Sequence, residues 1–181
     1  MPDSNPIRKG KRSIQTEAWS WVKCILCGIV IALALDFLVI ANARVPTGSM
    51  EDTIPVGARI IGLRHSYLFK EPQRGDIIIF KYPDDESVHY VKRVIGLPGE
   101  TVIIADGNVY VDGTALEEPY LNTVTLGDYG PYTVPEGSYF VMGDNRNDSR
   151  DSRFWDNTYV AKDKIVAKVK LMYYPKFKRL N

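Results

Sequence analysis

The sequence predicts a mainly β protein that follows a single N-terminal membrane-spanning helix. One long apolar run lies near the N-terminus, between residues 24 and 43. After it, apolar residues come in short or alternating runs, which is typical of strands, and no stretch keeps the 3.6-residue period of an amphipathic helix. The 14 glycines and 11 prolines interrupt these runs, which favours turns between strands. A chain of 181 residues leaves room for one folded domain.

The composition argues against several classes of protein. Hydrophobic residues make up 45% and charged residues 25% of the chain, close to a soluble average, which argues against disorder and against a polytopic membrane protein. The net charge of +1 gives no reason to expect a nucleic-acid partner. The two cysteines, Cys24 and Cys27, are too few for a disulfide scaffold or a four-cysteine zinc site. Their apolar surroundings favour helix packing over redox or metal chemistry.

The apolar run is long enough to cross a membrane. The 20 residues from Cys24 to Ala43 contain one charge, Asp36, and such a length suits a helix that crosses a hydrocarbon core of ~30 Å. Trp19 and Trp21 precede the run, where aromatic side chains anchor a span at the membrane interface. We therefore expect one transmembrane helix.

The residues before the run predict its orientation. Residues 1–18 are polar and contain a basic cluster made of Arg8, Lys9, Lys11 and Arg12. Basic residues before a span favour a cytoplasmic N-terminus. The predicted organisation is a cytoplasmic tail over 1–18, an anchor helix over 19–43 and an extracytoplasmic β domain over 44–181.

A second interpretation of the N-terminal segment stays open on composition alone. Ala41-Asn42-Ala43 has the small-x-small form of a signal-peptide cleavage site, and a 12-residue apolar run behind a basic segment fits a signal peptide. The segment is therefore either a retained anchor or a cleaved signal peptide.

Five runs in the remaining chain predict strands. Apolar, β-branched and aromatic residues dominate them; they are Asp76–Phe80, Thr101–Ile104, Val109–Val111, Ser138–Met142 and Ile165–Met172. Asp106-Gly107 lies between two of these runs, which predicts a hairpin. A sandwich or barrel-like β domain follows from this pattern.

Three clusters carry candidate chemistry. The chain has two histidines, and neither His65 nor His89 lies in a recognisable catalytic motif. Ser49 stands beside a glycine directly after the apolar run, a setting that can expose a nucleophilic hydroxyl. Lys92 lies in an apolar, strand-like run, where desolvation lowers the pKa of a lysine and lets its amine act as a general base. The third cluster, residues 142–155, is dense in polar and charged groups.

These clusters, in this order behind an N-terminal span, resemble bacterial type I signal peptidases of peptidase family S26. The resemblance covers nearly all of the chain after residue 20. It rests on four segments: Gly48–Met50, Arg74–Phe80, Lys92-Arg93 with Gly96–Glu100, and Gly143–Arg146 with Asp151–Arg153. The family pattern has proline where this chain has Asp52, which affects the local turn and not the chemistry.

The resemblance implies a role for each matching residue. Ser49 matches the nucleophile and Lys92 the general base. The Thr47 hydroxyl and the Ser49 backbone N–H match the oxyanion hole, and Ser149 matches a serine that orients the lysine. Asp151 and Arg153 match a supporting ion pair. The positions that match the walls of the substrate pocket are Val45, Met50, Ile54, Tyr90 and Val91.

The resemblance also implies a fold and an activity. The fold is a barrel-type catalytic β domain, and the activity is that of a membrane-bound serine endopeptidase that removes signal peptides from secreted preproteins after a small-x-small motif. The implied partners are preproteins and the lipid bilayer, near the secretion translocon, with no metal or organic cofactor. The span is then a retained anchor, although self-cleavage near Ala43 is a testable alternative. Two other functions remain as alternatives: another anchored Ser-Lys processing protease and an anchored β domain that only binds.

Overall fold

The computed structural model describes residues 14–180, except for the side chains of residues 14–16 and 35–37. The predicted basic cluster at residues 8–12 lies outside this part of the chain. Residues up to Leu38 and residues from Val39 onward form two compact units, which are described separately below.

The first unit contains one long helix, α1, from Ile14 to Val39. Its 26 residues extend over about 39 Å at ~1.5 Å per residue, and the stretch from Glu17 to Ala34 is apolar enough to cross a membrane. The helix begins before the predicted start at residue 19 and ends before the predicted end at residue 43. The helix ends earlier than expected because Ile40–Arg44 forms a strand, whose backbone pairs with another strand instead of continuing the helix.

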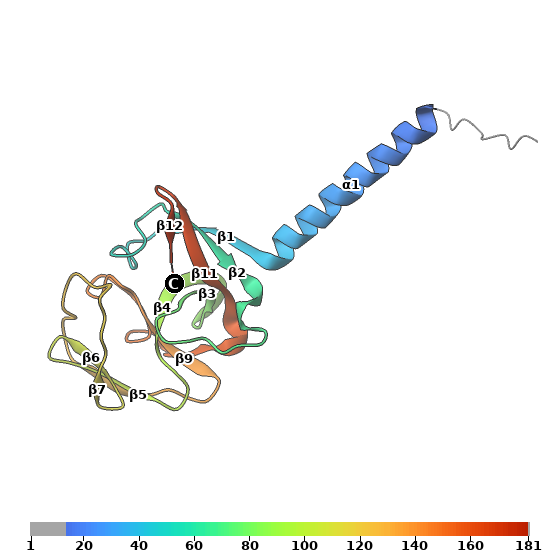
Figure 1. Ribbon diagram of the computed structural model, residues 1–181. Helices are drawn as coiled ribbons and strands as arrows, with labels where there is room; N and C mark the ends of the chain where they lie inside the picture. Colours follow the sequence, from blue (N-terminus) through green and yellow to red (C-terminus); the bar gives the residue numbers. More distant parts are fainter. Residues whose placement is uncertain (1–13, 181) are drawn as a thin grey trace, which may run out of the picture. The chain divides into compact units, whose positions relative to one another are not determined.

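The second unit is built from two antiparallel sheets (Figure 1). The larger sheet has the order β1-β2-β11-β3-β4-β9-β10, with β12 paired to β11. Its strands are β1 (Ile40–Arg44), β2 (Arg59–Leu63), β3 (Ile77–Tyr82), β4 (Asp85–Gly96), β9 (Ser138–Met142), β10 (Val160–Ala161), β11 (Ile165–Tyr174) and β12 (Lys178–Arg179). Two short 3₁₀ helices flank β2 and β11, η1 (Arg64–Tyr67) and η2 (Lys162–Lys164).

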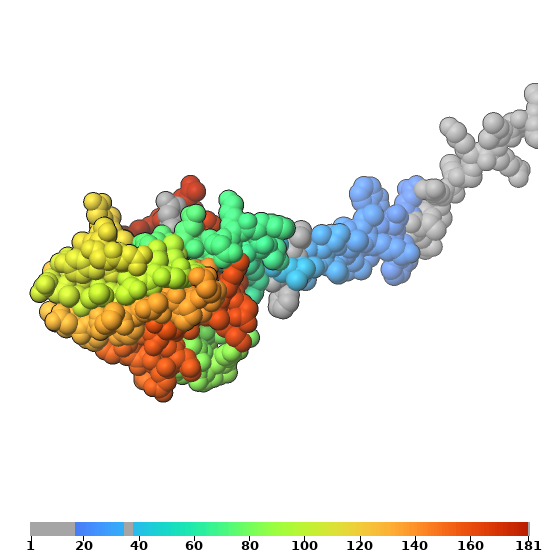
Figure 2. All heavy atoms as spheres, turned by 90° about the horizontal axis from the view of Figure 1, so that it is seen from below, coloured from blue at the N-terminus to red at the C-terminus, as the bar shows by residue number. Residues whose placement is uncertain are grey.

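The smaller sheet has the order β7-β6-β5-β8. Its strands are β5 (Thr101–Ala105), β6 (Asn108–Val111), β7 (Thr114–Ala115) and β8 (Tyr129–Thr133). Figure 2 shows its strands β5, β6 and β7, in lime to yellow, beside the orange segment that contains β8 and β9. The mainly β class is confirmed, but the sheets are open: within residues 14–180 the end strands β1 and β10 do not pair with each other, so no closed barrel forms.

The five predicted strands are confirmed as β3, β5, β6, β9 and β11, with small differences at their ends. The predicted hairpin is also confirmed, because β5 and β6 pair across Asp106 and Gly107, whose φ angles are 51° and 79°. The apolar pattern of the sequence did not predict β1, β2, β7, β8, β10, β12 or the first half of β4. Polar, exposed residues fill the first half of β4, so hydrophobicity gives no sign of it.

The core lies on both faces of the larger sheet. Ile77 and Ile79 point into one cluster of buried residues, together with Met50 and Ile54. Ile78 and Phe80 point into another cluster on the opposite face. The run Ile77–Phe80 therefore shows no alternation because both of its faces are buried.

Candidate active site

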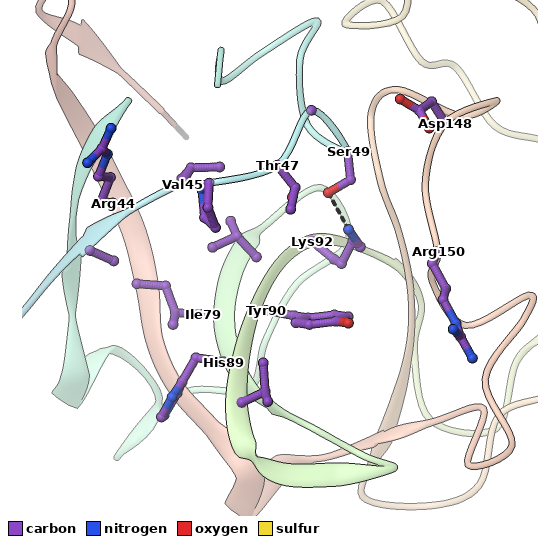
Figure 3. A pocket seen from close by; sticks show the side chains of 15 residues that line it. Arg44, Val45, Thr47, Ser49, Ile79, His89, Tyr90, Lys92, Asp148 and Arg150 are labelled. Atoms are coloured by element: carbon purple, nitrogen blue, oxygen red, sulfur yellow. Dashed lines mark hydrogen bonds between the residues drawn. The ribbon is translucent and has the colours of Figure 1, made fainter. Parts of the chain in front are cut away.

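The side chains of Ser49 and Lys92 meet at one point of the second unit. Ser49 lies on the turn that follows β1, and Lys92 lies in the middle of β4. The Lys92 Nζ is 2.5 Å from the Ser49 Oγ (Figure 3). Ser49 is 9% and Lys92 3% exposed, so the contact is nearly free of bulk water. The two residues that the sequence singled out are thus brought together by the fold.

The backbone around Ser49 is fixed from two directions. The Ile54 N–H donates to the carbonyl of Met50 at 2.6 Å and closes the turn. The loop after β9 supplies Asn145, whose backbone N–H donates to the Ser49 carbonyl and whose side-chain amide donates to the Gly48 carbonyl, both at 3.1 Å. The backbone that carries the Ser49 hydroxyl is therefore held by a turn and by a second loop far away in sequence.

Burial changes the acid–base chemistry of Lys92. Desolvation lowers its pKa from 10.5 to about 8, because the charged ammonium loses its water. The carboxylates of Asp151 and Asp144 raise the pKa and offset part of this effect, whereas Arg153 lowers it. A substantial fraction of Lys92 is then neutral near pH 8 and can accept a proton.

Ser149, Asp151 and Arg153 form a buried group next to the pair. The Ser149 hydroxyl donates to Asp151 at 2.7 Å, and the Arg153 Nε donates to the same carboxylate at 2.8 Å. Among the described residues, no hydrogen bond joins Ser149 to Lys92. The Ser149 hydroxyl donates its proton to Asp151, so the lone pairs of the Ser149 Oγ remain available to accept a hydrogen bond from an amine.

Gly143 packs tightly between this group and Ser49. A Cβ at Gly143 would lie 2.2 Å from the Ser149 Oγ and 2.3 Å from the Ser49 carbonyl oxygen. The Gly143 N–H donates to Asp151 at 3.0 Å. The absence of a side chain is what lets the two serines approach.

A cleft opens beside the Ser49–Lys92 contact (Figure 3). Three of the predicted pocket residues, Val45, Tyr90 and Val91, line it, as does Thr47. Met50 and Ile54, the other two residues predicted for the pocket, are fully buried in the core and are not among the residues that line the cleft. The reason is the turn after Ser49, which directs these side chains inward toward β3.

Comparison with known proteins decides the family. The family described as "Signal peptidase, peptidase S26" matches residues 18–174. The chain belongs to this family. A probable signal peptidase I-2 from Synechocystis is 34% identical over 173 residues, which are 92% of this chain and 78% of that protein. A signal peptidase I from Bacillus licheniformis is 41% identical over 145 residues, covering 75% of this chain and 77% of that one.

A solved structure is also similar. It is a signal peptidase I from Enterococcus faecalis, which is 38% identical, covers 55% of this chain and 97% of its own, and superposes with a TM-score of 0.49. The sequence relationships identify the chain as a type I signal peptidase, and therefore as a serine endopeptidase. The apolar helix α1 fits the membrane anchoring of such an enzyme.

Several residues at this site have no role predicted from the sequence. Arg93 and Asp144 form a buried pair, with Nε–Oδ1 and Nη2–Oδ2 distances of 2.8 and 2.6 Å. Thr53 donates to the same carboxylate at 2.5 Å. His89 and Ile79 line the cleft. A charged Arg93 inside the apolar strand run was the signal for a buried partner, but the sequence does not identify that partner.

Proposed function

We propose that this signal peptidase cleaves preproteins with Ser49 as the nucleophile and Lys92 as the general base. The observation that carries the proposal is the 2.5 Å contact between the Ser49 Oγ and the Lys92 Nζ, buried at the floor of an open cleft. A domain that only binds gains nothing from a buried lysine, because desolvating an amine is costly unless it has a use or a partner.

The first half of the reaction forms an ester. The neutral Lys92 amine takes the Ser49 proton while the Oγ attacks the carbonyl carbon of the residue before the scissile bond. The resulting tetrahedral intermediate breaks its C–N bond, and the Lys92 ammonium gives its proton to the departing amine, which becomes the N-terminus of the mature protein. The signal peptide stays attached to Ser49 as an acyl group.

The second half regenerates the enzyme. Lys92 takes a proton from a water molecule, whose oxygen attacks the ester carbonyl. The proton then returns to the Ser49 Oγ as the C–O bond of the ester breaks, and the signal peptide leaves as a carboxylic acid, which loses its remaining proton to water. Each step uses the same amine, which is why a pKa near the working pH is favourable.

The oxyanion of both intermediates needs donors. Thr47 lies beside Ser49 on the cleft wall (Figure 3), and its hydroxyl is the first donor. The second is the Ser49 backbone N–H, which has no acceptor among residues 14–180. An unpaired N–H next to the reacting oxygen suits a charge that develops in the transition state.

Two unpaired strand edges suit an extended substrate. β1 is an end strand of the larger sheet, so one of its edges has no partner strand among residues 14–180. Residues 89–91 of β4 pair with β3 on one side, whereas pairing with β9 begins at Arg93. Both segments line the cleft. A peptide can therefore add as a strand, and Val45, Ile79 and Val91 leave space for small side chains.

The test uses full-length enzyme in detergent and precursor peptides analysed by mass spectrometry. With alanine at −1 and −3, we expect one cut, after the −1 residue, and none with phenylalanine at either position. Ser49→Ala is expected to give no product. Cleavage that ignores −1 and −3, or that persists in Ser49→Ala, would contradict the proposal.

We further propose that α1 crosses the bilayer once, with the preceding tail cytoplasmic and the β unit outside the cell membrane. Ser49 then lies ten residues after the end of the helix, close to where a preprotein leaves the secretion translocon. In a cysteine-free background, a membrane-impermeant maleimide should label Ser87→Cys in intact cells but Ser4→Cys only after lysis. The reverse labelling would overturn this topology.

A further inference from the structure

A long connection between the small-sheet strands contacts the loop after β9 that carries Gly143, Ser149 and Asp151, which we call the catalytic loop. We call residues 116–128 the strap; they join β7 to β8 and contain no helix or strand. Side chains hold the strap in place. The Asn147 side chain accepts from the Leu126 N–H at 2.8 Å and donates to the Val124 carbonyl at 3.0 Å. The strap is therefore tied to the loop that carries Gly143 and Ser149.

The strongest tie is the ion pair between Glu118 and Arg146. The Arg146 side chain is 0% and the Glu118 side chain 8% exposed. The Nη1 donates to the Oε2 at 2.8 Å, and the Nη2 donates to the Oε1. Tyr120, also on the strap, donates its hydroxyl to the Oε1 at 2.6 Å. Within residues 14–180, Glu118 is the carboxylate bonded to Arg146.

Arg146 passes this restraint to the catalytic loop. Its Nε donates to the Gly143 carbonyl at 3.0 Å, and its own carbonyl accepts from the Arg153 Nη2 at 2.6 Å. Gly143 lies against Ser49 and Ser149, as described above. A chain of direct contacts thus runs from Glu118 to the predicted nucleophile.

We propose that Glu118 is a positioning residue for catalysis, because it fixes Arg146 and thereby holds Gly143 against Ser49 and Ser149. The inference rests on the proposed function. Without Glu118, a buried guanidinium would lack its counter-charge. It would then compete for the carboxylates of Asp144 and Asp151, which now hold Arg93 and Arg153.

The strap also covers Arg93, which is buried like Arg146. The Tyr120 ring lies over the Arg93 guanidinium, 3.8 Å from the ring centroid. Arg93 follows Lys92 directly on β4. None of the strap residues lines the cleft, so changes in the strap should affect turnover more than substrate binding.

The first experiment measures kcat and KM of full-length Glu118→Gln on a precursor peptide, well below its thermal transition. We expect kcat to fall about 10²-fold, since a displacement of ~1 Å at a reacting group has this effect, and KM to stay close to the wild-type value. Glu118→Asp, which keeps the charge, should recover part of kcat. The matched control is Glu100→Gln, which breaks the Arg74–Glu100 pair away from the cleft and should keep the wild-type kcat.

The second experiment separates positioning from stability. The double variant Glu118→Leu/Arg146→Met removes the whole pair, and replacing a buried ion pair with apolar residues is often neutral for stability. We expect its kcat to stay low even with a wild-type melting temperature. Full kcat in the double variant or in Glu118→Gln would overturn the proposal. An inactive wild-type enzyme would instead count against the proposed function.

Discussion

Gly143 and Ser149 approach each other so closely that a methyl group on Gly143 would lie 2.2 Å from the Ser149 Oγ. The Ser149 Cβ would lie 2.6 Å away as well, so rotating the Ser149 hydroxyl does not relieve the contact and one of the two backbones must move. The same methyl group would lie 2.3 Å from the Ser49 carbonyl oxygen. Gly143→Ala is therefore expected to displace Ser49, and kcat should fall about 10²-fold.

Initial rates on a precursor peptide test this expectation. Gly28→Ala is the matched control, because a Cβ there meets no atom within 4 Å and alanine suits a helix. Wild-type turnover by Gly143→Ala would show that the close packing has no part in catalysis.

The pH dependence of kcat/KM should follow Lys92. Its pKa is lowered to about 8, and the neutral amine is the active form. Activity is therefore expected to fall as the pH drops below 8, by about tenfold per pH unit at the acidic end. A profile that stays flat down to pH 6, or that rises only above pH 10, would be incompatible with a desolvated lysine base.

Thr47→Val should remove one oxyanion donor while keeping the shape of the side chain. The loss of one such donor typically lowers kcat by about 10²–10³-fold. Thr47→Ser, which keeps the hydroxyl, is expected to retain most of the activity. Equal kcat values for the valine and serine variants would assign the oxyanion to other groups.

The buried pair of Arg93 and Asp144 should contribute to stability. Their side chains are 7% and 0% exposed, so Asp144→Asn would leave a buried guanidinium with a weaker partner. Removing one member of a buried pair costs about 3–5 kcal/mol in the free energy of unfolding, which urea titration can measure. The exposed Glu86→Gln is the comparison and should leave the midpoint unchanged. Equal midpoints for both variants would refute the role of burial.

The sequence predicted those strands and turns whose own residues determine their structure. The runs that became β3 and β9 are apolar, and Asp106-Gly107 suits the positive φ angles of its hairpin. The end of α1 was not predictable from hydropathy, because Ile40, Ala41 and Ala43 continue the apolar run of the helix. Pairing with β2, distant in sequence, makes this segment a strand.

In the candidate site too, residues with a local signal were predictable and contacts between distant segments were not. Ser49 and Lys92 could be singled out because a serine next to glycine and a lysine in an apolar run are locally unusual. Glu118 and Arg146 could not be paired, since nothing in the sequence indicates that the strap folds onto the catalytic loop.

The most direct test of the central claim is the rate of Lys92→Ala on a precursor peptide with alanine at −1 and −3. Lys81, a partly exposed lysine on β3, provides the control variant Lys81→Ala. We predict no detectable turnover for Lys92→Ala and wild-type turnover for Lys81→Ala. Full activity of Lys92→Ala, folded and at the same pH, would contradict the assignment of Lys92 as the base for Ser49.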